Sequence, residues 1–346
     1  MNNRPFKKIT YFALALDPIH VGTGGYRLGR VDNTIIRDPG TDIPKIPGTS
    51  LAGVARAYTA MAIQSQNPNM AKYMREETNP DGSRTYASCA GKGGEQGEGH
   101  CGEPDCPVCI AFGFSKGKEN ISFQGLAQFY DARILFFPVS SALGPVWITS
   151  PMLLSAAQIE AKDITCSDMN NELSEDNSVL TNITLADNRI NLSWLFLNVK
   201  EDKSINPSEW SIDGQKLSSF TELKEILERV VIVSDRLLSM IINDNLEVRT
   251  SVAIDPLTGA AVEGALYTYE AIPRGTVLWF DVIYNDPKYF RVPKKEQENV
   301  SYIPIQCTMD TLIKSVCNGL SLFEYLGVGG MGTRGMGRMR IFCLGR

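Results

Sequence analysis

The chain has 346 residues, of which 43% are hydrophobic, and its formal net charge is −5. This length allows one large hydrophobic core or two smaller ones, and the acidic balance excludes a uniformly basic nucleic-acid-binding protein. No apolar run approaches the roughly 20 residues that a membrane-spanning helix needs, and the N-terminal segment lacks an apolar signal-peptide core. We therefore expect a cytoplasmic protein with no membrane partner.

The first elements predicted are a strand over 9–16 and a Gly-rich loop from His20 to Gly25 that bends the backbone sharply. A second short strand, 34–37, follows Asp32. Thr49 or Ser50 is then predicted to cap a helix, because apolar residues recur after them at helical spacing. These apolar residues are Leu51, Val54, Ala55, Tyr58 and Ala62, and Arg56 lies off their stripe.

Regular periodicity stops near Asn67, and 67–122 predicts an insertion too polar to build its own core. This segment contains four of the eight cysteines, all within one stretch of 21 positions: Cys89, Cys101, Cys106 and Cys109. In a reducing compartment this clustering favours a metal site over disulfides, and Cys-x-x-Cys supplies two tetrahedral Zn²⁺ ligands from one turn. We expect a closed, structural zinc site, with His100 as an alternative ligand to Cys101 or Cys89.

The second half of the chain predicts strands over 123–139, 147–148 and 192–199, and a helix near 152–162. The acidic, Asn-rich 163–188 predicts a mobile surface segment. Amphipathic helices are predicted over 218–233 and 236–242, a β-hairpin over 247–270 with a turn at 255–259, a buried strand over 277–284, a helix over 309–325 and a final strand over 339–344.

Two Gly-rich loops are candidate cradles for a nucleic-acid backbone. Residues 327–337 contain six glycines, with Arg334 inside the run and Arg338 at its edge. A backbone without Cβ atoms can approach a phosphate chain closely and point its N–H groups at it, and Arg adds charge and stacking. No Gly-Lys-Ser/Thr follows, which argues against a nucleotide-binding P-loop, although a plain flexible turn remains the alternative. The glycines after His20, among them Gly22 and Gly24, form a second cradle.

The order of these motifs resembles the RAMP superfamily. The residues that carry the resemblance are His20-x-Gly22, Val31-Asp32-Asn33, Ile36-Arg37-Asp38-Pro39, Ile46-Pro47-Gly48-Thr49-Ser50-Leu51, Tyr130-Asp131-Ala132-Arg133, the 247–275 hairpin and the terminal Gly-rich loop. The nearest group in it is the backbone subunits of type III CRISPR effector complexes. The resemblance implies a single α+β domain over 1–346, with a ferredoxin-like (RRM-like) palm, helical fingers, a β-hairpin thumb over 247–270 and the zinc-binding insertion 67–122.

The resemblance also implies a function. Such subunits bind CRISPR guide RNA, assemble with other subunits of the effector and cleave complementary target RNA beside an Asp, and the matching position here is Asp32. The reaction is an attack of the ribose 2′-OH on the adjacent phosphate, and Asp32 could orient or deprotonate the hydroxyl or hold Mg²⁺ or Mn²⁺. An ordinary Asp, with a pKa of about 3.9, is a poor base at neutral pH, which favours metal binding or positioning.

Further RNA contacts follow from the matched motifs. The family often carries Ser-Leu-Lys-Gly at the helix start, and here Ala52 replaces the Lys, which leaves Ser50 and Arg56 as candidate phosphate contacts. Gly329 and Gly330 belong to the cradle. In the thumb, Leu266 and Tyr267 suit a wedge that stacks between bases, although an exposed hairpin can equally pack on a neighbouring subunit.

Two other interpretations compete with a cutting subunit. The first is a non-catalytic structural RNA-binding subunit of the same complex, in which Asp32 is a bystander, since fold and RNA binding do not imply chemistry. The second is a stand-alone zinc enzyme or guide-processing ribonuclease. The closed cysteine cluster and the presence of only two histidines, His20 and His100, count against that one.

Overall fold

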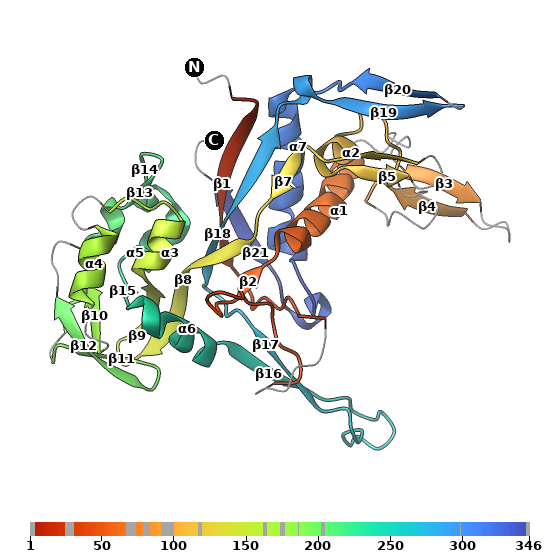
Figure 1. The fold of residues 1–346 in the computed structure, drawn as a ribbon. Helices are drawn as coiled ribbons and strands as arrows, with labels where there is room; N and C mark the ends of the chain where they lie inside the picture. The colour runs from red at the N-terminus through yellow and green to blue at the C-terminus, as the bar shows by residue number, and fades with distance from the viewer. Residues whose placement is uncertain are drawn as a thin grey trace.

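A computed structural model describes residues 4–24, 31–66, 74–78, 84–90, 100–116, 120–161, 165–173, 177–185, 187–201, 205–297 and 299–343. Its centre is a mixed sheet of 11 strands (Figure 1). In spatial order the strands are β11 (Arg189–Leu192), β12 (Leu195–Glu201), β10 (Ser178–Thr181), β15 (Val230–Ile232), β9 (Gly144–Thr149), β8 (Ala132–Ser141), β18 (Val277–Asn285), β1 (Phe6–Ala15) and β21 (Met339–Cys343), with β2 (Lys45–Ile46) on β8 and β7 (Ala127–Phe129) on β18.

One half of the sheet has the strand order β21-β1-β18-β8, and every pairing in it is antiparallel. Helix α1 (Gly48–Gln66) follows β1, and helix α7 (Met309–Ser321) leads through the short α8 (Phe323–Leu326) to β21. The two long helices pack against each other beside this half of the sheet (Figure 1). The mixed α+β class predicted from the sequence is confirmed.

Strand β1 is buried on both faces. Tyr11 and Ala13 belong to the core under α1 and α7, whereas Phe12 points into a second core. The second core lies under the helices of the other half, which are α3 (Pro151–Ala156), α4 (Cys166–Glu172) and α5 (Lys224–Leu227). Because side chains alternate across a strand, an unbroken apolar run of this kind is typical of a strand between two layers.

Three hairpins project from the body of the protein (Figure 1). The hairpin of β16 (Glu247–Ser251) and β17 (Tyr267–Ala271) confirms the strand pairing predicted for 247–270, and its loop reaches well away from the body. The other two are β3 (Met74–Thr78) with β4 (Arg84–Ser88), and β19 (Arg291–Glu296) with β20 (Asn299–Pro304). The sequence did not predict β19–β20, because charged residues and Pro293 interrupt β19, and β20 is almost wholly exposed.

Two sequence-based predictions are wrong in the second half of the sheet. The segment 163–188, expected to be a surface segment, contains helix α4 and strand β10, all four residues of which are buried. The segment 218–233, expected to be one helix, forms short 3₁₀ turns and α5, and then enters the sheet as β15. Strand β10 is held by pairing with β12, and strand β15 by pairing with β9. A local sequence pattern does not predict such pairing.

The segment 67–122 is built partly of short elements: β3, β4, α2 (Pro107–Phe112), β5 (Phe114–Lys116) and β6 (Ile121–Phe123). Its buried residues, such as Ile110 and Phe114, belong to the same core as Tyr11 and Leu51. The segment therefore packs on the main core. Within the described residues, no helix is both long enough and apolar enough to cross a membrane.

Candidate RNA-cleavage site and metal centre

Asp32 lies on an extended segment that runs beside strand β17. Asn33 forms a parallel bridge with Tyr269, its N–H donates to the Thr268 carbonyl at 3.0 Å, and its carbonyl accepts from the Glu270 N–H at 3.2 Å. The strand predicted over 34–37 is thus a run of isolated bridges in place of a regular ladder. This arrangement places the exposed Asp32 at the base of the 247–270 hairpin.

The Asp32 carboxylate is held by one residue of the hairpin. Its Oδ2 accepts from the Thr268 backbone N–H at 2.6 Å and from the Thr268 hydroxyl at 2.8 Å. These two hydrogen bonds, the backbone one first, lower the pKa of Asp32 below its ordinary value. Asp32 is therefore ionised at neutral pH, and it is an even weaker base than an ordinary aspartate.

A buried ion pair fixes the segment that follows Asp32. Arg37 donates to both carboxylate oxygens of Glu270, at 2.6 and 3.0 Å, and Glu270 is only 5% exposed. The same carboxylate accepts from the backbone N–H of Ile35 at 2.8 Å, and Arg37 also donates to Asn243 of helix α6 (Asp235–Asp244). The two charges of this bidentate pair offset each other, so the pair adds no net charge beside Asp32. Its role is to fix the position of the segment that follows Asp32.

The two Gly-rich segments meet in one structure. His20 forms a bridge with Gly330, whose N–H donates to the His20 carbonyl at 2.8 Å. The imidazole is buried, and its Nδ1–H donates to the Glu270 carbonyl at 2.7 Å, so the ring braces strand β17. Gly22 pairs with Ile35, and Gly24 borders open space, while the neighbouring Gly25 lies outside the described residues.

Gly329 shows why this junction requires glycine. Its φ is +89°, and a Cβ there would lie 2.4 Å from the His20 carbonyl oxygen. We expect Gly329→Ala to lower the free energy of unfolding by more than about 2 kcal/mol, through strain and a backbone clash. Urea unfolding measures the loss. Gly332→Ala is the matched control, because a Cβ at Gly332 meets nothing within 4 Å. Equal stability of the two variants would contradict the prediction.

The two arginines of the C-terminal loop lie in different environments. Arg334 is exposed, its guanidinium lies 5.4 Å from the Tyr267 ring centre, and it donates to the Tyr267 hydroxyl and to Ser251. Arg338 forms an ion pair with Asp17, in which Nη2 lies 3.2 Å from Oδ1. Arg334 therefore presents positive charge at the hairpin base, whereas the charge of Arg338 is offset by a carboxylate.

The hairpin loop carries exposed apolar side chains beyond this base. Leu266 is 66% exposed and Leu257, at the turn, is 95% exposed. The turn predicted at 255–259 is present, with the Gly259 N–H donating to the Asp255 carbonyl at 2.8 Å. An apolar projection of this kind is available to stack on bases or to pack on a protein surface.

The start of helix α1 differs from the prediction. The helix begins at Gly48, whose N–H donates to the Asp131 carboxylate at 2.8 Å, so the expected cap by Thr49 or Ser50 is wrong. Lys45 bridges Asp131 and Asp38, at 2.8 and 3.4 Å. A carboxylate already occupies the positive end of this helix. Ser50 lies half-buried in the first turn, where its hydroxyl contact with RNA stays a prediction.

Arg56 points toward the cysteine cluster. Its Nε donates to the Cys89 carbonyl and Nη1 to the Gly113 carbonyl, both at 2.8 Å. Its Nη2 is buried with no hydrogen-bond partner among the described residues. Burial lowers the pKa of Arg56, and the four cysteines oppose that shift. In this structure the Arg56 side chain links α1 to the insertion. The contact predicted between Arg56 and an RNA phosphate stays a prediction.

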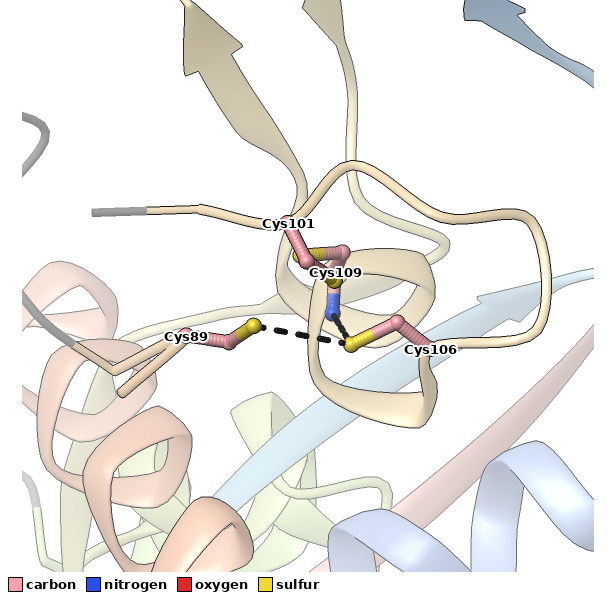
Figure 2. Close-up of side chains that lie close together, drawn as sticks. All are labelled: Cys89, Cys101, Cys106 and Cys109. Atoms are coloured by element: carbon pink, nitrogen blue, oxygen red, sulfur yellow. Dashed lines mark hydrogen bonds between the residues drawn. The ribbon is translucent and has the colours of Figure 1, made fainter. Parts of the chain in front are cut away.

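The four cysteines converge on one point (Figure 2). All four Sγ atoms lie within 4.8 Å of one another, and the Cys89–Cys106 and Cys101–Cys109 pairs are each 3.8 Å apart. A tetrahedron with Zn–S bonds of about 2.3 Å has S–S edges of about 3.8 Å, whereas a disulfide needs about 2.05 Å. The two measured S–S separations match such an edge, and the four sulfurs can hold a metal ion without His100.

The local fold explains this convergence. Cys106 is the N-cap of α2, Pro107 begins the helix, and the Cys106 sulfur accepts from the Cys109 N–H at 3.4 Å. Cys89 ends the β3–β4 hairpin, and Cys101 enters from the loop before α2. In the part of the chain that the structure describes, this is the only group of three or more His, Cys, Asp or Glu residues able to hold a metal ion. We therefore assign no Mg²⁺ or Mn²⁺ ligands around Asp32.

Three important residues were not found from the sequence: Thr268, Glu270 and Tyr269, all on β17. Each acts through a partner more than 200 positions away, as the Thr268–Asp32 and Glu270–Arg37 pairs show. The only available signal was the resemblance over 247–275, which does not assign roles to single side chains.

Comparison with solved structures shows which known fold the chain has. The model matches a chain of the type III-B Cmr-beta complex in its apo state, with a TM-score of 0.57, 15% identity and coverage of 97% of both chains. It matches a Cmr4 crystal structure with a TM-score of 0.53, 19% identity and coverage of 97% of this chain and 98% of the other. The fold is therefore the one found in Cmr subunits.

Sequence comparison then gives the family. The RAMP superfamily model matches residues 13–340, so the chain belongs to the RAMP superfamily, as its motifs predicted. A curated relative, the CRISPR system Cmr endoribonuclease Cmr4 of Pyrococcus furiosus, is 25% identical over 331 residues, covering 94% of this chain and 92% of that protein.

Proposed function

We propose that this chain is a guide-RNA-binding backbone subunit of a type III CRISPR effector complex and that it cleaves paired target RNA at Asp32. The observation that carries the proposal is the exposed Asp32 carboxylate, held by Thr268 at the base of the hairpin. The similarity to an endoribonuclease over 94% of the chain supports it. Its partners are guide RNA, complementary target RNA and the other effector subunits, in the cytoplasm.

The chemistry is internal transesterification. The ribose 2′-oxygen attacks the adjacent phosphorus, the bond to the 5′-oxygen breaks, and the products are a 2′,3′-cyclic phosphate and a 5′-hydroxyl. Asp32 accepts a hydrogen bond from the 2′-OH and orients it in line with the leaving oxygen. Because the pKa of Asp32 is lowered, solvent finally takes the proton of the 2′-OH, and solvent also protonates the departing 5′-oxygen. Arg334, exposed beside Tyr267, meets the phosphate backbone.

The parts of the fold take matching roles. The strand order β21-β1-β18-β8, with α1 and α7, supports a ferredoxin-like palm within a single domain over 1–346. The hairpin over 247–270 is the thumb, and Leu266 and Tyr267 lie along the side that meets bases. His20, Gly329 and Gly330 shape the backbone of the cradle, with Gly22 and Gly24 beside it. Ser50, Arg56 and Arg338 complete the proposed RNA contacts.

The four cysteines of the insertion 67–122 hold a structural Zn²⁺. The 3.8 Å sulfur separations support this, and so does the buried Arg56. Four thiolates around Zn²⁺ carry a net charge of −2, which a buried guanidinium offsets, whereas four neutral thiols would leave its charge uncompensated. The bound ion would supply fold stability alone, because a closed ligand set leaves no position for a reacting water.

The test of the proposed function is to map the cuts. The assembled complex is incubated with end-labelled target RNA, and the product ends are identified. We expect cuts at regular spacing with cyclic-phosphate ends, and no cleavage of a target with 2′-deoxyribose at the cut positions. Specific target binding without any cut at this subunit's position would overturn the cleavage assignment and favour a structural role.

A further inference from the structure

Thr268 contacts Asp32 through three hydrogen bonds that together close a reciprocal clamp. The backbone N–H and the hydroxyl of Thr268 donate to Asp32 Oδ2, at 2.6 and 2.8 Å. In return the Asp32 N–H donates to the Thr268 hydroxyl oxygen at 3.0 Å. Oδ1 of Asp32 accepts no hydrogen bond from the residues that the structure describes. Thr268 thus engages one carboxylate oxygen, and the exposed side chain leaves the other open to a ligand.

We propose that Thr268 is a positioning residue for cleavage: it orients Asp32 so that Oδ1 faces the RNA and receives the 2′-OH. This inference rests on the proposed function of Asp32 and deepens it. An aspartate has two rotatable bonds, and an exposed carboxylate with no partner samples several orientations. The clamp reduces these to one, and a placement error of about 1 Å at a reacting group can cost about a hundredfold in rate.

The clamp also ties Asp32 to the thumb. Thr268 lies on β17, the strand that continues directly into the exposed Leu266. The Asn33–Tyr269 bridge and the Arg37–Glu270 pair hold the two segments in register on either side of the clamp. The thumb base and the Asp32 carboxylate therefore move as one unit, so a thumb seated between bases also sets the place of the carboxylate.

The two donors of Thr268 have an electrostatic consequence. They lower the pKa of Asp32, and no charged neighbour contributes to that shift. The nearby charged groups are engaged elsewhere: Glu270 with Arg37, and Arg334 with Tyr267. Loss of the hydroxyl removes one of the two donors, so the pKa of Asp32 rises toward its ordinary value. On acidification, a variant without this hydroxyl should therefore lose cleavage at a higher pH than the unmodified protein does. The reason is that the protonated carboxyl no longer accepts from the 2′-OH.

The experiment compares three substitutions in the assembled complex under single-turnover conditions. Thr268→Val removes the hydroxyl at constant shape, and we expect cleavage to slow about tenfold or more with target binding unchanged. Thr268→Ser keeps the hydroxyl and is expected to cleave within about threefold of the unmodified complex. Thr184→Val is the matched control, because Thr184 is exposed and lies outside the hairpin and the Asp32 segment.

The pH profile separates positioning from a general structural effect. The acid limb of the cleavage rate should move to higher pH in Thr268→Val and stay in place in Thr268→Ser and Thr184→Val. If Thr268→Val does not assemble, Thr268→Ala removes the same hydroxyl with a smaller side chain and replaces it in all measurements.

The outcomes for Thr268 and Asp32 are distinguishable. A normal rate and an unmoved acid limb in Thr268→Val, with Asp32→Ala inactive, would overturn the clamp and leave the proposed function standing. Normal cleavage by Asp32→Ala would overturn the proposed function itself, and the clamp with it. If Thr268→Ser cleaves as slowly as Thr268→Val, the lower rate comes from altered packing and not from the missing hydroxyl. That result would also reject the clamp.

Discussion

Replacing Asp32 with alanine should reduce target-RNA cleavage by at least about a hundredfold, while the complex still assembles and binds its target. The carboxylate is exposed, and its contacts with the described residues are confined to Thr268. Its loss therefore removes the group that orients the 2′-OH and leaves the core untouched. Cleavage is measured as a single-turnover rate on labelled target RNA, and binding is measured on the same RNA carrying 2′-deoxy substitutions.

Two further variants sharpen the result for Asp32. Asp32→Asn keeps the shape, and its amide oxygen can still accept from Thr268, but the NH₂ group then faces the RNA as a donor where an acceptor is needed. We expect it to be as slow as Asp32→Ala. The matched control is Asp187→Ala, an exposed carboxylate beside β11 at the other end of the sheet, which should cleave normally. Normal rates in both Asp32 variants would reject the assignment.

Replacing Cys106 and Cys109 with serine should abolish zinc binding and destabilise the insertion by more than about 3 kcal/mol. Both thiols are buried and belong to the four-sulfur cluster, so two of the four ligands are lost. The purified protein should contain about one zinc per chain before the change and none after it. Metal analysis measures the first effect, and thermal unfolding together with proteolysis measures the second.

The control for this experiment is Cys166→Ser. Cys166 is half-buried, lies on α4 far along the chain and is not part of the cluster, so this variant should keep its zinc and its melting temperature. A chelator should reproduce the effect of the double substitution in the unmodified protein. Zinc retained by the Cys106 and Cys109 double variant would reject the four-cysteine site, and zinc lost without any loss of stability would reject a structural role.

The elements that the sequence predicted well share strong local patterns. Strands β1 and β18 are apolar runs bounded by polar residues, and α6 and α7 have apolar residues at helical spacing. Each pattern is complete within one element, so no knowledge of the rest of the chain is needed. The helix predicted over 309–325 divides into α7 and α8 at Leu322, a boundary that packing decides.

The elements that the sequence did not predict depend on distant partners. Strand β15 is three residues long, and it enters the sheet because β9 and β10 flank it. The hairpin β19–β20 is largely exposed, and it lies against the insertion, where Lys294 pairs with Glu103 at 3.7 Å. Short or exposed strands of this kind gain their stability from neighbours, so their own residues carry little signal.

The chemical groups of this protein were determined by the sequence alone. The glycine run 327–337 and the four clustered cysteines could be identified because residue type and spacing carry their chemistry, and Asp32 was identified through the resemblance of its motif to the family. The tertiary structure decided how these groups are used. It placed Asp32 against Thr268, 236 positions away, joined the two Gly-rich loops at His20 and Gly330, and turned Arg56 toward the sulfur cluster. Such contacts depend on which strands and loops become neighbours, and only the packing of the whole sheet decides that.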